Sequence, residues 1–111
     1  MLEPTQQLFG NRLRTMVLQS LRLLGETYPS ELAALLGARL YSIQQILASL
    51  ERESVVVSRM FGRTRRVTLN QRYFAYRPLE KLLWEMGKND EALQRLLAQK
   101  RRRPRRTGKA L

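Results

Sequence analysis

Two β-branched runs around a glycine turn constrain the fold of this chain more than any other feature. Residues 55–57 (Val-Val-Val) and 67–69 (Val-Thr-Leu) flank the segment 62–64 (Gly-Arg-Thr). β-branched residues are enriched in strands, and a short connection that contains glycine is typical of a hairpin. Residues 55–70 are therefore predicted to form an antiparallel hairpin.

Two helices are predicted early in the chain, because apolar residues recur there at spacings of three and four. The first covers residues 11–24, begins at an asparagine N-cap and ends at Gly25. The second is short. It runs from a cap at Ser30 through residues 31–36 and ends at Gly37.

A third helix is predicted from about Leu40 to Arg52, directly before the hairpin. Its predicted inward residues are Leu40, Ile43, Ile46, Leu47 and Leu50. Its predicted outward residues are Tyr41, Ser42, Gln44, Gln45 and Ser49. The outward face is polar and nearly uncharged.

The C-terminal part is predicted to be helical again. A helix should begin after Pro78, with Leu79, Leu82, Leu83 and Met86 inward. Residues 87–90 should interrupt it, and Asp90 should cap a last helix that carries Leu93, Leu96 and Leu97.

Length and charge set the domain organisation. The chain has 111 residues, of which 43% are apolar, so one folded domain is expected. The net charge is +12, and residues 100–111 hold seven basic residues and no acid. We therefore predict an N-terminal arm (1–10), a folded domain (11–99) and a disordered basic tail (100–111), in a mainly α protein with a small β-hairpin, of the α+β class.

Missing residue types exclude several functions. The sequence has no cysteine and no histidine, so disulfides, thiolate or imidazole metal sites and His- or Cys-based nucleophilic catalysis are excluded. No metal, cofactor or enzymatic activity is expected. No stretch approaches the ~20 apolar residues of a membrane span, which favours a cytoplasmic protein associated with the nucleoid.

The order helix, short helix, glycine turn, polar-faced helix and basic hairpin favours binding to duplex DNA. Such a pair of helices places the second one in the major groove, where amides pair with base edges, while a basic loop contacts phosphates or the minor groove. Candidate contacts of the third helix are Arg39, Tyr41, Ser42, Gln44, Gln45 and Ser49. Candidate contacts of the hairpin are Arg59, Arg63, Thr64, Arg65 and Arg66. Candidate nonspecific contacts of the tail are Lys100, Arg101, Arg102, Arg103, Arg105 and Arg106.

Residues 28–37, 42–51, 55–59 and 62–70 resemble the ArsR-like winged helix-turn-helix regulators. The resemblance spans roughly residues 12–86. It implies that the third helix recognises DNA, that the hairpin is the wing and that the terminal helices build a homodimer. Metal-sensing members bind their ion through Cys or His, so that role does not carry over. Arg39 and Leu40 also stand where Ser and Pro are usual in the family.

The sequence therefore predicts a sequence-specific transcriptional regulator, a repressor that acts as a homodimer on a pseudo-palindromic site. Apolar residues beyond the needs of a small winged core are expected to pair the two copies: Leu13, Met16, Val17, Leu21, Leu82, Leu83, Leu93, Leu96 and Leu97. The aromatic residues Tyr73, Phe74, Tyr76 and Trp84 are expected in the core or the dimer contact. A winged helix used as a protein-interaction module, and a nonspecific nucleoid or RNA-binding protein, remain as alternatives.

Overall fold

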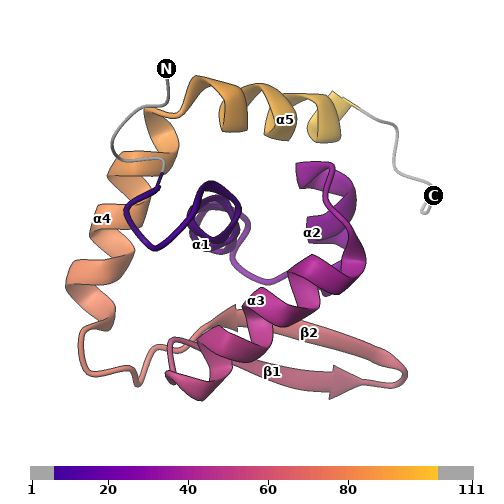
Figure 1. Ribbon diagram of the computed structural model, residues 1–111, viewed down its shortest axis with the longest axis vertical. Coiled ribbons are helices and arrows are strands. Elements are labelled where there is room, and N and C mark those ends of the chain that lie inside the picture. The colour runs from indigo at the N-terminus through magenta and orange to yellow at the C-terminus, as the bar shows by residue number, and fades with distance from the viewer. Residues whose placement is uncertain (1–6, 103–111) are drawn as a thin grey trace.

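The computed structural model describes residues 7–102, which form five helices and a two-stranded antiparallel hairpin (Figure 1). In chain order the elements are α1 (Arg12–Leu24), α2 (Pro29–Leu36), α3 (Leu40–Arg52), β1 (Val56–Phe61), β2 (Thr64–Leu69), α4 (Tyr76–Lys88) and α5 (Glu91–Arg102). The predicted α+β class is confirmed. Three helices followed by a hairpin give a winged-helix arrangement, to which α4 and α5 are added.

The hairpin has the tight turn that the sequence predicts. β1 and β2 pair antiparallel up to Phe61 opposite Thr64, so only Gly62 and Arg63 form the connection. Gly62 has a φ of 61°, a left-handed conformation that a residue without Cβ adopts at little cost. The turn therefore fixes which residues lie at the tip of the wing.

A backbone bridge fastens the wing to the connection between α1 and α2. The N–H of Thr27 donates to the carbonyl of Val67 at 3.0 Å, and the N–H of Val67 donates back to the carbonyl of Thr27 at 2.7 Å. β2 thus lies between Thr27 and β1. The connection before α2 and the wing are held in one sheet-like arrangement.

The helix ends follow local signals, with two corrections. Asn11 caps α1 by accepting from the N–H of Arg14 at 2.8 Å, as predicted. The predicted start of α2 is wrong, because α2 begins at Pro29 and Ser30 lies inside it. Proline suits the first helical position, where its missing N–H is not needed. For the same reason α4 starts at Tyr76 rather than after Pro78, which lies in its first turn.

α1 lies at the centre of the fold, and Figure 1 looks along it, with the other elements around it. Residues 15–21 are all buried, so this helix is covered on every side. The main core joins it to α2, α3, the hairpin and α4, through Val17, Leu18, Leu21, Leu32, Ile43, Leu47, Leu50, Val56, Val67, Leu69 and Leu83. A second cluster joins α1 and α2 to α5, through Met16, Leu35, Leu93 and Leu97.

The second cluster accounts for several of the apolar residues that were predicted from the sequence to form a dimer contact. Leu93 and Leu97 of α5 are 0% and 2% exposed within a single chain. Met16, Val17, Leu21 and Leu83 are buried in the same chain. These residues, predicted to pair two copies, instead attach α5 and α4 to α1. The sequence argument for a dimer is therefore wrong for them.

Three predicted inward or core residues are exposed. Leu40 is 43% exposed, because it is the first residue of α3 and precedes the part of the helix that is buried from Ile43 on. Leu82 is 42% exposed, since α4 turns its neighbour Leu83 into the core. Phe74 is 92% exposed in the loop before α4 and contacts the ring of Tyr73, so of its two predicted places, the core and the dimer contact, the core is wrong.

The last helix begins as predicted and ends later. Asp90 accepts from the N–H of Leu93 at 3.1 Å, which confirms the predicted cap. α5 continues to Arg102, three residues past the predicted end at 99, so the first part of the predicted disordered tail is helical. Residues 103–111 lie outside the described residues. No helix among residues 7–102 combines the length and apolarity needed to cross a membrane.

Candidate nucleic-acid interface

α2, the turn at Gly37 and α3 form the helix pair predicted from the sequence. Gly37 ends α2 in the left-handed conformation, with a φ of 62°, and its N–H donates to the carbonyl of Ala33. Only Gly37, Ala38 and Arg39 separate the two helices. This short connection directs α3 away from α2 and leaves one side of α3 uncovered.

The uncovered side of α3 is polar and carries no charge along three turns. Tyr41 is 69% exposed, and Gln44 and Gln45 are exposed beside it, whereas Ile43 and Leu47 are buried in the core. No acidic residue lies between Leu40 and Leu50. An exposed row of amide and hydroxyl groups on a helix can both donate to and accept from base edges.

The other predicted residues of α3 differ in their environments. Ser49 is half-buried, and its hydroxyl accepts from Nη1 of Arg14 at 3.0 Å, so this side chain is turned toward α1. Ser42 is half-buried. Arg39 occupies the N-cap position, makes no side-chain cap bond and is exposed. In the described part of the chain Arg39 has no ion pair, so its charge is available to an external anion.

The four wing arginines do not form one group, because strand alternation divides them. Arg65 shares a face of the hairpin with the buried residues Val67 and Leu69. Its guanidinium forms an ion pair with Glu51 near the end of α3. About a third of each side chain is exposed, so this pair is partly shielded from solvent. Arg65 therefore links the wing to α3.

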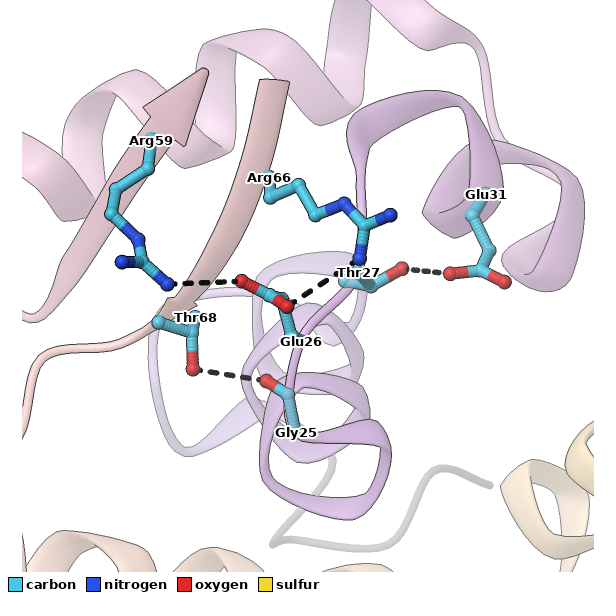
Figure 2. A network of polar contacts seen from close by, with 7 residues as sticks. All are labelled: Gly25, Glu26, Thr27, Glu31, Arg59, Arg66 and Thr68. Carbon is cyan, nitrogen blue, oxygen red and sulfur yellow. Dashed lines mark hydrogen bonds and ion pairs between the residues drawn. The ribbon is translucent and has the colours of Figure 1, made fainter. Parts of the chain in front are cut away.

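Arg59 and Arg66 lie on the opposite face of the hairpin, directly across from each other. Figure 2 shows both guanidiniums reaching the carboxylate of Glu26 in the α1–α2 connection. The N···O distances are 3.7 Å from Arg59 and 3.5 Å from Arg66. Each guanidinium carbon also lies 5.2 Å from the ring centroid of Phe61.

The connection that carries Glu26 is itself held to the hairpin by two further contacts in the same view. The hydroxyl of Thr68 donates to the carbonyl of Gly25 at 3.0 Å, and that of Thr27 donates to Glu31 in α2 (Figure 2). Together with the Thr27 bridge, these bonds hold the backbone on both sides of Glu26 against the hairpin.

Arg63 and Thr64 lie at the tip of the wing and are exposed. Among the residues that the structure describes, Arg63 forms no ion pair. Of the four predicted wing arginines, it is thus the one whose charge no protein carboxylate offsets. In the view of Figure 1 the tip lies on the same side as the start of α3.

The sequence alone did not identify two carboxylates that form ion pairs with the wing arginines, those of Glu26 and Glu51. Arg66 and Glu26 are 40 positions apart, and Arg65 and Glu51 are 14 apart, so no local pattern connects them. The predicted tail contacts divide at the end of α5. Lys100, Arg101 and Arg102 belong to that helix, and Arg103, Arg105 and Arg106 lie outside the described residues.

The fold is of the winged-helix type, and one side of α3, the second helix of the α2–α3 pair, is exposed. Comparison with protein-family models, with curated proteins and with solved structures found no match to this chain. Within residues 7–102, no three carboxylate, thiol or imidazole side chains come close enough to hold a metal ion. The resemblance to ArsR-like regulators stays a prediction.

Proposed function

We propose that this protein binds duplex DNA sequence-specifically and acts as a transcriptional repressor, with α3 in the major groove. The observation that carries the proposal is the exposed, uncharged polar side of α3, where Tyr41, Gln44 and Gln45 are uncovered. A helix of ~12 Å diameter fits the major groove, and glutamine pairs in bidentate fashion with adenine there.

Phosphate contacts are assigned to arginines without a protein partner. Arg39 at the start of α3 and Arg63 at the wing tip are both exposed. Such contacts place the protein on the duplex and release condensed counterions, but they do not read sequence. Arg65 is left out of this group, because Glu51 already binds it.

A homodimer remains part of the proposal, with a different contact from the one that the sequence indicated. A two-fold protein suits a pseudo-palindromic site. Since Leu93 and Leu97 are buried within one chain, the contact is assigned to the exposed flank of α4 at Leu82, which is 42% exposed.

A second candidate function is a protein-interaction module, and one observation favours it. Leu40, Met60 and Phe61 are 43%, 63% and 48% exposed on α3 and the wing, which is more apolar surface than a phosphate-binding face needs. The third candidate, nonspecific nucleoid or RNA binding, rests on the excess of basic residues in the sequence.

Selection from a random duplex library separates the three candidates. The proposal predicts an enriched sequence that the full chain binds at least ~10³-fold more tightly than a scrambled duplex at physiological salt. Equal affinity for both duplexes and for RNA would support the nonspecific candidate. No binding to any duplex, even at low salt, would favour the protein-interaction candidate and overturn the proposal.

A further inference from the structure

The face of the wing that carries Arg59 and Arg66 holds an anion already, the carboxylate of Glu26. The two arginines lie opposite each other across the hairpin, and their guanidiniums reach the two oxygens of this one carboxylate from either side (Figure 2). Two positive groups that converge on one point match the geometry of a phosphate, which arginine binds readily. The cluster keeps a net charge of +1 with Glu26 in place.

Glu26 holds this position loosely. Its N···O distances of 3.5 and 3.7 Å exceed the ~2.7–2.9 Å of a strong charge-assisted hydrogen bond. The side chains of Arg59, Arg66 and Glu26 are 71%, 44% and 36% exposed, so solvent and an incoming ligand reach them. Exposed ion pairs of this kind contribute little to stability, so another anion can replace Glu26 at a small cost in free energy.

A second arginine–carboxylate contact of the wing, between Arg65 and Glu51, differs from this cluster. The Arg65–Glu51 pair is less exposed, with 34% and 28% of the side chains accessible. The Arg65–Glu51 pair thus holds the wing to α3, whereas Arg59 and Arg66 share one weakly bound carboxylate. Phe61 keeps the two guanidiniums in place when their anion changes, because both lie 5.2 Å from its ring centroid.

We propose that Arg59 and Arg66 form a binding site for a nucleic-acid backbone phosphate, and that Glu26 occupies this site as an internal competitor until a phosphate displaces it. This inference rests on the proposed function and assigns Glu26 a regulatory part in it. Glu26 lowers affinity for every duplex by a similar factor, because the competition is for a phosphate and not for a base. The carboxylate therefore limits nonspecific binding of a strongly basic protein.

The test is the substitution Glu26→Gln in the full chain, which keeps the size and removes the charge. Affinity for both a selected and a scrambled duplex is expected to rise about three- to tenfold. Glu53→Gln is the matched control. Glu53 caps the end of α3, is exposed and forms no ion pair in the described residues, so its loss changes net charge equally without freeing an arginine.

A double-mutant cycle completes the test. Glu26→Gln in a chain that also carries Arg59→Ala and Arg66→Ala is expected to give no gain beyond that of Glu53→Gln, because the freed site is absent. A gain equal to that of the control, or a loss of affinity, would overturn the inference, and a loss would mean that Glu26 orders the arginines for binding. If the unsubstituted chain binds no duplex at low salt, it is the proposed function that fails. Thermal melting of each variant identifies any unfolded one.

Discussion

Arg63 and Arg65 stand two residues apart on the wing, and their environments assign them different tasks. Arg63 is exposed at the tip without an ion pair among the described residues, whereas Arg65 is bound to Glu51 of α3. We therefore propose Arg63 as a phosphate contact, whereas Arg65 links the wing to α3. A charge count of the wing does not separate these roles.

Alanine substitutions at these two positions should separate binding from stability. Arg63→Ala is expected to weaken binding to all duplexes and to flatten the salt slope by about 0.9, the value for one lost phosphate contact, with no change in unfolding. Arg65→Ala is expected to lower the free energy of unfolding by about 1 kcal/mol. Urea melts and binding isotherms measure both, and Arg77→Ala, an exposed arginine on α4, controls for the loss of charge. Unchanged affinity for Arg63→Ala would remove the wing tip from the interface.

The sequence predicted single residues well where the signal is local. The cap at Asn11, the turn at Gly62 and the cap at Asp90 follow from the chemistry of a few neighbouring residues. The pairing of Arg66 with Glu26 depends on how the chain returns on itself over 40 positions, so it has no local pattern. The division of the wing arginines into two faces could be inferred only once the register of β1 and β2 was known.

At the scale of elements, α5 is part of the core of one chain. Leu93 is fully buried against α1 and α2, together with Met16, Leu35 and Leu97. An amphipathic helix has the same sequence pattern whether its apolar side packs within the chain or on a second copy. Periodicity therefore predicted the existence of this helix but not the surface that it covers.

Leu93→Ala should destabilise the single chain, if α5 belongs to its core. The expected loss is about 2–5 kcal/mol, the range for deleting a buried leucine side chain. Leu8→Ala is the control, because Leu8 is 53% exposed and should change stability by less than about 0.5 kcal/mol. Chemical unfolding at several protein concentrations measures the effect. An equal, small loss for both variants would mean that α5 is not packed on α1 in solution.

At the scale of the whole molecule, α1 is covered by its own chain, and we propose that two copies pair through α4 at the exposed residue Leu82. Light scattering at micromolar concentration is expected to give twice the 13.0 kDa of one chain. Leu82→Lys should shift this mass to that of one chain without changing the melting curve, because a lysine in the contact buries an unpaired charge. A mass of one chain for the unsubstituted protein, with no increase on adding duplex, would rule out the homodimer.

The central claim is that α3 reads base edges, and the most direct measurement concerns Gln44 and Gln45. Each is substituted by alanine, and affinity is measured on the selected site and on a scrambled duplex, with Gln71→Ala, an exposed glutamine outside α3, as control. We expect a loss of about 1–3 kcal/mol at the selected site for at least one of the two, little loss on the scrambled duplex, and no change for the control. Equal losses on both duplexes, or no loss on either, would contradict it.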